Sequence, residues 1–475
     1  MNSKLTVKEK AAYGLGAVGK DMVYMLSASY VLYYFQDILG VSAVAMGIIL
    51  LGARVFDAFN DPIMGIIVAK TKTRWGKFRP WLFIGTVTNA VVLFIMFSAP
   101  PTLDAAGLTA YAAITYILWG VTYTMMDIPY WSMVPAFTEG GKEREGLSTL
   151  ARSCAGVGSA LITIITMLAV HGLGAMFVSE GDGAQTLERL GFKYFALIIA
   201  ILFVVFITIT CVTIKEKSTV DMQTASVGEM FKALVTNDQA MAVVISIVLI
   251  NCAMYITSNL VIYFFKYDFG GTAWYGSYTL FNTVGGGVQI LSMMLLYPLL
   301  RKFFSSLKIF FIGLGMAIVG YIVLLGLTFT SMQNVMILII PAVFIFAALG
   351  VLTVLTTVFL ANTVDYGDLK NNRRDESVIF SMQTFVVKLA SGVAAFVASV
   401  CLQINSLSND AVTEADQTVD FSLSVDASAK LGLRMTMTII PVILMVIAFF
   451  WFRSKYILTD EKLAEIDEKL KERNQ

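Results

Sequence analysis

The chain contains few of the residues that enzymes and metal proteins rely on. Its 475 residues include one histidine and four cysteines, and only 14% are charged. His171 falls in a predicted outer loop, which argues against a histidine proton relay, and the cysteines lie apart in apolar runs as small buried side chains. We find no nucleophile–base pair, zinc-ligand spacing or phosphate loop, so we expect neither an enzyme nor a bound cofactor. A net charge of +1 also argues against a nucleic-acid partner.

Hydrophobic residues, in contrast, make up 57% of the chain, and its mean hydropathy is +0.76. A soluble domain is nearer one quarter charged, so lipid must be the main solvent of this chain. Because about 20 apolar residues span the hydrocarbon, the sequence predicts an all-α integral membrane protein with about twelve transmembrane helices. The predicted spans are 12–37, 44–69, 80–99, 108–137, 147–171, 191–214, 240–265, 275–300, 308–329, 334–364, 378–404 and 431–454.

Lys and Arg gather in alternate loops, most densely in KTKTRWGKFR (70–79), whereas the loop 405–430 is acidic. The basic loops and both termini are therefore predicted to be cytoplasmic, with the chain in a bacterial cytoplasmic (inner) membrane. The start, MNSKLTVKEK, has no small-residue cleavage site, so we expect the first helix to be retained. Six spans, a central loop and six more are typical of major-facilitator transporters. The predicted parts are a six-helix bundle (1–214), a central cytoplasmic loop (215–239), a second bundle (240–455) and a cytoplasmic amphipathic tail (456–475).

The central loop contains a capping-box pattern, Ser226 followed three residues later by Glu229, which predicts a short amphipathic helix. Such a helix either steadies the inner face during transport or is a linker on the membrane surface. The pattern favours the linker.

The second predicted helix carries charges that each cost roughly 2.5–3.5 kcal/mol at the bilayer centre. Asp57 and Asp61 stand four residues apart and share a helical face, with Arg54 one turn before Asp57. Asn60 adds an amide oxygen, and Pro62 frees a backbone carbonyl. Two carboxylates among neutral oxygens suit a hard monovalent cation. The alternative is a charge cluster that locks this helix to its neighbours through Arg54, but a lock does not need two acids on one face.

In the fourth predicted helix, Gly120, Thr124, Asp127 and Trp131 form a single stripe. Asp127 can accept hydrogen bonds from two hydroxyls, and Trp131 offers a flat apolar face. A sugar needs both, because it has a hydroxyl rim and a C–H face. Thr124 is close enough to lend its hydroxyl to the cation. The alternative is an ordinary packing helix with one buried ion pair.

Further charges lie inside the predicted spans, at Lys20 and Asp21 in the first and at Arg152 in the fifth. We expect Arg152 to pair with Asp21 or Asp127 in the empty site and to donate to sugar oxygens in the filled one. The eleventh span adds Gln383, Thr384 and Lys388. Lys388 is the only clear charge at membrane depth in the second half, where it is suited to balance the acids of the second helix.

Several of these segments resemble a known family. They are ARVFDAFNDPIMG (53–65), RWGKFRP (74–80), TYILWGVTYTMMDIPYWSMVP (115–135), NTVDYG (362–367) and SMQTFVVK (381–388). They resemble the melibiose permease-like members of the glycoside–pentoside–hexuronide cation symporter family, within the major facilitator superfamily. The similarity runs along most of the chain and is densest in the first 155 residues.

The resemblance implies a major-facilitator fold of two six-helix bundles and symport of a galactoside-like sugar with Na⁺, Li⁺ or H⁺. It implies a cation site at Asp57, Asn60, Asp61 and Thr124. It implies sugar contacts at Lys20, Asp21, Tyr123, Asp127, Trp131, Arg152, Gln383, Thr384 and Lys388.

Two positions depart from the family pattern. Thr353 stands where melibiose permeases carry a Trp beside the sugar, and Asn362 replaces the first Asp of DTVDYG. Loss of that aromatic wall is expected to widen or shift the sugar preference. The retained Asn60 supplies a neutral oxygen that a proton would not need, which favours Na⁺ over H⁺.

We therefore predict that a cation enters first and neutralises Asp57 and Asp61, after which Asp127 is presented to the sugar. The expected partners are a small glycoside, a monovalent cation and membrane lipid, with no obligatory protein partner. One rival hypothesis is a proton-coupled antiporter that exports drugs or metabolites through the same acids. Another is a non-transporting membrane sensor or a lipid carrier.

Overall fold

A computed structural model describes residues 5–134, 141–179, 182–216, 227–330, 334–371, 376–407 and 420–473. Throughout these ranges the chain is helical apart from short connections. Contacts within the chain divide it into two compact units, residues 1–224 with 408–421, and residues 225–407 with 422–475. Each unit is described by itself below.

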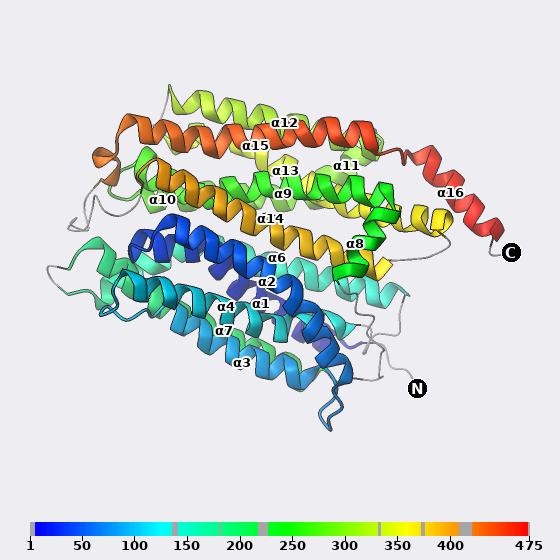
Figure 1. Ribbon diagram of the computed structural model, residues 1–475, viewed down its shortest axis with the longest axis horizontal. Helices are drawn as coiled ribbons and strands as arrows, with labels where there is room; N and C mark the ends of the chain where they lie inside the picture. The colour runs from blue at the N-terminus through cyan, green and yellow to red at the C-terminus, as the bar shows by residue number, and fades with distance from the viewer. Residues whose placement is uncertain are drawn as a thin grey trace. The chain divides into compact units, whose positions relative to one another are not determined.

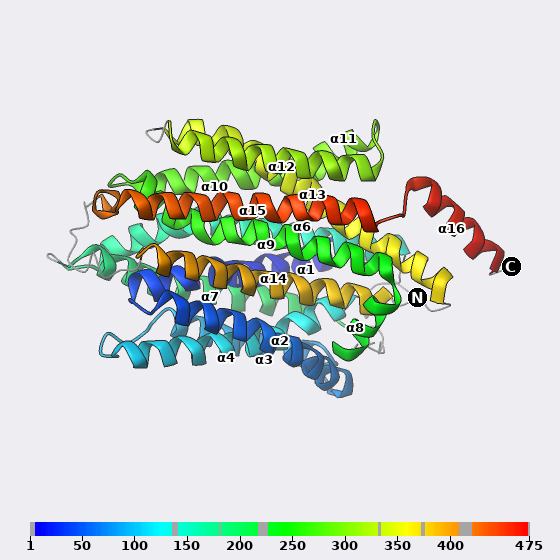
Figure 2. The ribbon, with the colours of Figure 1, turned by 45° about the horizontal axis from the view of Figure 1, so that its top comes forward.

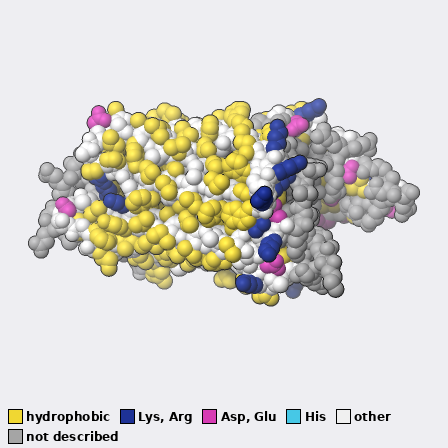
Figure 3. Space-filling view, turned by 90° about the horizontal axis from the view of Figure 1, so that it is seen from below, with side chains coloured by type: hydrophobic (Ala, Val, Ile, Leu, Met, Phe, Trp, Pro, Cys, Tyr) yellow, Lys and Arg dark blue, Asp and Glu magenta, His cyan; other side chains and the backbone are white. Residues whose placement is uncertain are grey.

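Eleven helices are long and apolar enough to cross a membrane. They are α2 (Ala43–Lys70), α3 (Arg79–Met96), α4 (Ala105–Ser132), α6 (Gly141–Phe177), α7 (Ala184–Thr213), α9 (Asp238–Phe264) with η2 (Phe265–Phe269), α10 (Trp274–Leu291) with η3 (Ser292–Leu296) and α11 (Tyr297–Arg301), α12 (Ser306–Thr328), α13 (Val335–Asn371), α14 (Glu376–Ile404) and α15 (Ala427–Lys455). On one face of the molecule, Figure 3 shows apolar side chains in a broad band and Lys and Arg gathered toward one end.

The remaining long helix, α1 (Val7–Leu32), continues into η1 (Tyr33–Ile38) and is less apolar because it carries Lys20 and Asp21. Its environment compensates, since α6 and α7 cover it (Figures 1 and 2) and half of its side chains are buried. With α1, the described residues contain the twelve long helices that the sequence predicts. Their order along the chain also matches the predicted spans.

In the first unit, glycines allow α1, α6 and α7 to approach closely. A side chain at Gly158 in α6 would collide with the carbonyl of Val18 in α1, and one at Gly191 in α7 would collide with that of Val170 in α6. Such contacts are typical of helices in membranes, where van der Waals packing replaces the hydrophobic effect as the main attraction. These two glycines therefore set how close the helices lie.

The loop between α2 and α3 is fixed by a carboxylate that follows α7. Glu216 accepts hydrogen bonds from the backbone N–H groups of Lys77 (2.7 Å), Phe78 (3.0 Å) and Arg79 (3.1 Å), where α3 begins. A negative group at a helix N-terminus satisfies otherwise unpaired donors. Gly76 has φ of +112°, and a side chain there would strike Glu216. The RWGKFRP segment thus forms a defined turn.

The first long helix of each unit ends in the same way. α1 and α9 each end in a wide π-helical turn, closed by a hydrogen bond from Leu39 N to Tyr34 O (3.1 Å) and from Gly270 N to Phe265 O (3.0 Å). In the first unit α2 starts at Ala43, four residues after Leu39. In the second unit α10 starts at Trp274, four residues after Gly270. This is an internal repeat that the sequence reading did not detect.

Several helices extend past the predicted spans, because hydropathy marks only their apolar parts. α6 runs to Phe177, so His171 lies inside a helix rather than in the predicted outer loop. In the central loop, α8 occupies Val227–Thr236, while Ser226 lies outside the described residues. The tail forms α16 (Asp460–Arg473), in which Lys462 and Lys469 lower the pKa of the exposed Glu465 to about 2.

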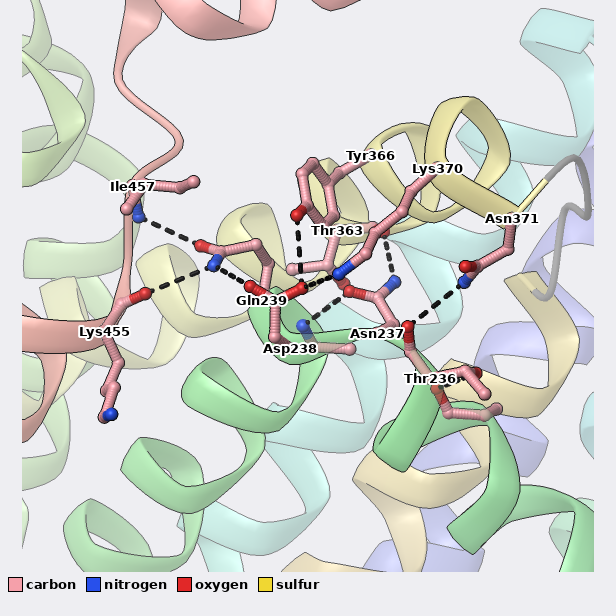
Figure 4. Close-up of polar contacts among 12 residues, drawn as sticks. Thr236, Asn237, Asp238, Gln239, Thr363, Tyr366, Lys370, Asn371, Lys455 and Ile457 are labelled. Atoms are coloured by element: carbon pink, nitrogen blue, oxygen red, sulfur yellow. Dashed lines mark hydrogen bonds and ion pairs between the residues drawn. The ribbon is translucent and has the colours of Figure 1, made fainter.

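At the start of α9, three consecutive side chains tie the second unit together (Figure 4). Asn237 caps α9 by accepting from Ala240 N, and its amide donates to the carbonyl of Thr363 in α13 (2.8 Å). Asp238 accepts from the hydroxyl of Tyr366 (3.1 Å) and forms an ion pair with Lys370, and both of these partners lie in α13. This end of α13 is thereby anchored to α9.

The third side chain, Gln239, holds the end of α15. Its amide nitrogen donates to the carbonyl of Lys455 (3.2 Å), and its oxygen accepts from the N–H of Ile457 (2.9 Å). Asn371 in α13 also donates to the carbonyl of Thr236, where α8 ends. Helices α8, α9, α13 and α15 thus meet in one polar network.

Candidate functional site

The predicted site residues of the first half lie on α1, α2, α4 and α6. Helix α4 follows an Asp104 cap that accepts from Gly107 N, and its 28 residues bring Thr124, Asp127 and Trp131 onto one side. Tyr13 of α1 and Tyr130 of α4 lock these two helices together. Each hydroxyl donates to the other residue's carbonyl at 2.6 Å, and the rings stack with centroids 4.4 Å apart.

Lys20 is the centre of a charge cluster between α1 and α4. Its ammonium lies 2.9 Å from Asp127 Oδ1 and 3.1 Å from Asp21 Oδ2, and it donates to the hydroxyl of Tyr123 (3.2 Å). The Lys20 side chain is 5% exposed, whereas those of Asp21 and Asp127 are 18% and 23% exposed. Two carboxylates share one cation, so the cluster carries a net charge of −1 and keeps acceptor capacity on its accessible side. This suits a ligand rich in hydroxyl donors.

Trp131 lies beside this cluster and is covered by a second cation. The Arg152 guanidinium is 4.4 Å from the Trp131 ring centroid, and Lys20 is 5.2 Å from it. The expected pairing of Arg152 with Asp21 or Asp127 is not what the structure shows, because Lys20 takes that role. Lys20 is buried between the two acids, while Arg152 is exposed and stacks on the indole.

Along α2, the two acids have separate partners. Asp57 is paired with Arg54 (3.1 Å), whose guanidinium lies between the rings of Tyr24 (5.9 Å) and Tyr116 (5.8 Å). Arg54 and Asp57 are buried, and the contacts of Arg54 with Tyr24 of α1 and Tyr116 of α4 are those that the alternative hypothesis of a charge lock expects. Asp57 and Asp61 therefore contact different groups in this structure, and their convergence on one cation stays a prediction.

Asp61, one turn further along α2, instead reaches α4. It accepts a 2.9 Å hydrogen bond from the hydroxyl of Thr124. Asn60 is half-buried, and its amide nitrogen is buried without a hydrogen-bond partner among the described residues. A flip of the Asn60 side-chain amide would exchange its nitrogen and oxygen and put the oxygen in this position, so Asn60 can serve as a neutral ligand for a cation. Gly120 lets α4 approach α2, since a Cβ there would be 3.0 Å from Asp57 Oδ1.

An aromatic cluster near these charges was missed by the sequence reading. Tyr116, Trp119 and Tyr123 succeed one another along α4, with centroids 5.8 Å and 5.1 Å apart, and Tyr24 of α1 contacts Trp119 and Tyr123. Their spacing of three and four residues is the helical signal that could have revealed them. Two members of this cluster, Tyr24 and Tyr116, lie beside the guanidinium of Arg54.

In the second unit, the predicted residues lie on α14. The amide of Gln383 is 3.4 Å from the hydroxyl of Thr357 in α13, while Thr384 is exposed and Lys388 half-buried. Thr353 donates to its own helix at Leu349 O (2.8 Å). The expectation that Lys388 balances the acids of α2 concerns both units and stays a prediction.

Lys388 was predicted to be the only clear charge at membrane depth in the second half, but the candidate membrane span Asp238–Phe269 also contains charged side chains. Lys266 and Asp268 in η2 are buried, and Asp268 accepts two hydrogen bonds from Arg434 of α15, at 2.6 Å and 2.7 Å. Asp268 falls in an outer loop between two predicted spans, so nothing in the sequence indicated that its side chain is buried. Within the described ranges, no three His, Cys, Asp or Glu side chains gather as a metal site.

Comparison with known proteins agrees with this architecture. A family described as MFS/sugar transport protein matches residues 12–460. The chain belongs to this family. It is therefore a multi-pass membrane transporter rather than an enzyme, and the predicted resemblance to glycoside–pentoside–hexuronide symporters is confirmed.

Two relatives illustrate how far the transporter's similarity extends. It is 28% identical to the uncharacterized symporter YjmB of Bacillus subtilis over 99% of this chain and 96% of that protein. It is 28% identical to the raffinose carrier protein of Pediococcus pentosaceus over 96% of this chain and 70% of that one. Both organisms are bacteria, which agrees with the predicted bacterial cytoplasmic membrane.

The fold is that of solved transporters. The crystal structure of a D-xylose–proton symporter matches with a TM-score of 0.59 at 15% identity, covering 93% of this chain and 96% of that one. At this identity the match shows the fold alone. It is the twelve-helix major-facilitator fold that the sequence predicts.

Proposed function

We propose that this transporter is a cation-coupled sugar symporter that carries a galactoside-like glycoside into the cell, with Na⁺ as the favoured ion. One observation carries the proposal. Thr124, which donates to Asp61, stands three residues before Asp127 on α4. The cation subsite and the sugar subsite are therefore joined by a single helical turn.

The sugar subsite of the first unit contains Lys20, Asp21, Tyr123, Asp127, Trp131 and Arg152. Its two partly exposed carboxylates accept from sugar hydroxyls, Arg152 donates to sugar oxygens, and Trp131 receives an apolar sugar face. Gln383, Thr384 and Lys388 are proposed to add contacts from the second unit. Because Thr353 lacks an aromatic ring, we expect tolerance of more than one glycoside.

The cation subsite contains Asp57, Asn60, Asp61 and Thr124. In this arrangement Arg54 supplies the positive charge that Asp57 requires. An entering Na⁺ binds oxygen atoms, so it takes Asp61 and Thr124 first and draws Asp57 away from Arg54. Once the acids are neutralised, α4 is held in place and Asp127 faces the sugar. A proton needs no amide oxygen, which is why Asn60 favours Na⁺ over H⁺.

Alternating access follows from the cost of unpaired charge in the membrane. The empty protein keeps Asp57 paired with Arg54, and the loaded one pairs the acids of α2 with the cation, so both forms can reorient. A half-loaded protein exposes an unbalanced charge and is held back. Uptake into the cell assumes that the basic loop 70–79 and both termini are cytoplasmic.

The test is uptake of a panel of radiolabelled α- and β-glycosides into proteoliposomes under imposed Na⁺, Li⁺ or H⁺ gradients. We expect accumulation of galactosides driven most strongly by inward Na⁺. Accumulation driven only by H⁺ would show that the coupling ion is H⁺ rather than Na⁺, whereas the proposal of sugar symport would stand. Efflux of lipophilic compounds in exchange for protons, with no sugar uptake, would instead establish the antiporter.

A further inference from the structure

The loop between α2 and α3 presents a basic surface that the proposed transport mechanism does not use. Lys72 and Arg74 are exposed in this loop, and Lys70 is exposed in the last turn of α2. Within the described part of the chain, the side chains of these three cations form no ion pair and no hydrogen bond. Together with Trp75 they are called the α2–α3 patch below. Its positive charge is open to a ligand.

Contacts within the loop hold it in one conformation. The hydroxyl of Thr73 donates to the carbonyl of Gly76 (2.6 Å), and the indole N–H of Trp81 donates to the hydroxyl of Thr71 (2.7 Å). Glu216 is engaged by three backbone N–H groups where α3 begins. A loop that is already ordered loses less conformational entropy when it binds a ligand.

Trp75 adds an aromatic ring to the patch. It is 39% exposed, and its ring packs edge-on against Phe83 of α3, with centroids 5.8 Å apart. The guanidinium of Arg79 lies 5.9 Å from the same centroid. The indole is thus fixed while part of it stays accessible. Tryptophan is enriched at the headgroup level of membranes, because its ring is apolar and its N–H is polar.

Exposed apolar side chains lead along both neighbouring helices toward the patch. On α2, Ile63, Ile66 and Ile67 are exposed and share a helical face with Lys70, which follows one turn later. On α3, Ile84 is exposed. Figure 3 shows Lys and Arg side chains gathered at one end of the apolar band on the face that it draws. The patch therefore lies where a lipid whose acyl chains follow these helices places its phosphate.

The corresponding loop of the second unit has an acid of its own. In that unit the second and third long helices are α10–α11 and α12, and α11 ends at Arg301. Arg301 pairs with Asp460 of α16 at 3.2 Å. Among the residues that the structure describes, no acid pairs with the three cations of the α2–α3 patch. The complementary charge is therefore expected from a molecule other than this chain.

We propose that the α2–α3 patch binds the phosphate group of an anionic phospholipid. Lys70, Lys72 and Arg74 neutralise the phosphate and donate hydrogen bonds to its oxygens. Trp75 packs against the glycerol backbone and the first acyl carbons of the same lipid. Basic residues next to a membrane helix attract anionic headgroups. The bound lipid joins the end of α2 to the start of α3. This site does not depend on what the protein transports.

Binding is measured by native mass spectrometry of the purified full-length protein in detergent, titrated with phosphatidylglycerol or with phosphatidylcholine. Lys72→Gln with Arg74→Gln removes two charges of the patch. Lys462→Gln with Lys469→Gln removes two exposed charges of α16 and is the matched control.

We expect the wild type and the control to prefer phosphatidylglycerol. One cation near an anionic headgroup contributes about fivefold in affinity, so the patch variant should bind this lipid roughly 25-fold more weakly. Its affinity for phosphatidylcholine should change little. Equal affinity of the patch variant and the control for phosphatidylglycerol would overturn the proposal.

Trp75 gives a second readout in the protein with its cations intact. The chain has six tryptophans, so the signal of Trp75 is the difference in fluorescence between the wild type and Trp75→Phe. Phosphatidylglycerol brominated on its acyl chains should quench this signal at least twofold more strongly than brominated phosphatidylcholine. Equal quenching by the two lipids would contradict the site.

Inorganic phosphate separates a lipid site from a site for a free anion. At the same concentration as the lipid, it should leave the quenching of Trp75 by brominated phosphatidylglycerol unchanged, because it lacks acyl chains. Full displacement of the lipid by inorganic phosphate would show that the patch holds a free anion and would overturn the lipid assignment.

Discussion

The hydroxyl of Thr124 donates a 2.9 Å hydrogen bond to Oδ1 of Asp61 and so joins α4 to α2. Helix α4 also carries Asp127, which contacts Lys20 of α1. Through these contacts a change at Asp61 reaches the sugar subsite over one turn of helix. Coupling between ion and sugar thus has a short physical route within the first unit.

Thr124→Ala removes the hydroxyl from this route. We expect the Na⁺ concentration needed for half-maximal sugar binding to rise about tenfold, equivalent to about 1.4 kcal/mol. Sugar affinity at saturating Na⁺ should change little. Thr124→Ser keeps the hydroxyl and is the matched control. Equal Na⁺ dependence in the alanine and serine variants would show that the hydroxyl does not serve the cation.

Lys20→Met removes the one cation that Asp21 and Asp127 share. The two acids then lose the ammonium that lies between them, and we expect a loss of roughly 3–5 kcal/mol in stability, measured as a lower Tm. The double variant Lys20→Met with Asp127→Asn should recover part of that stability, because it returns the cluster to the wild-type net charge of −1. Neither variant should bind sugar. A double variant no more stable than Lys20→Met would contradict the paired arrangement.

Gly158 and Gly156 offer a direct test of helix packing in α6. A Cβ at Gly158 would collide with the Val18 carbonyl, whereas one at Gly156 meets nothing within 4 Å. We expect Gly158→Ala to cost about 1–3 kcal/mol and Gly156→Ala to cost nothing measurable. Thermal unfolding in detergent compares the two. Equal Tm values would mean that α1 and α6 do not touch at Gly158.

Two ion pairs of the second unit differ in burial. Asp268–Arg434 is buried, while Arg301–Asp460 is exposed. Asp268→Asn leaves Arg434 without its partner and should cost roughly 3–5 kcal/mol. Arg301→Ala should cost less than about 1 kcal/mol, because water screens that pair. Thermal unfolding compares the stability of the two variants. Similar losses of stability would contradict the expectation that the buried pair contributes more than the exposed one.

The sequence predicted most of what depends on local composition. Apolar runs predicted the twelve helices, and the spacing of Asp57 to Asp61 and of Thr124 to Asp127 predicted which side chains share a face. The family resemblance implied that Thr124 and Asp61 line one cation site, and the structure joins them by a hydrogen bond. Hydropathy did not predict how far the polar ends of α6 and α13 extend, because those turns lie past the apolar stretch.

Contacts between distant segments had no local signal. Asp268 and Arg434 are 166 residues apart, and Tyr33 and Glu188 are 155 apart. Nothing near either residue in the sequence predicts its partner. Arg152 was predicted to pair with Asp21 or Asp127, but Lys20 lies between these acids, because only packing decides which cation reaches them.

The most direct test of the account measures sugar binding to the purified protein by calorimetry, with and without Na⁺, in the wild type and in Asp61→Cys. In the wild type we predict that Na⁺ tightens sugar binding, and that sugar tightens Na⁺ binding by the same factor, about 5- to 150-fold. In Asp61→Cys both effects should vanish while the protein stays folded. Equal sugar affinity with and without Na⁺ in the wild type, or undiminished stimulation in Asp61→Cys, would contradict the coupling of the two subsites through Asp61.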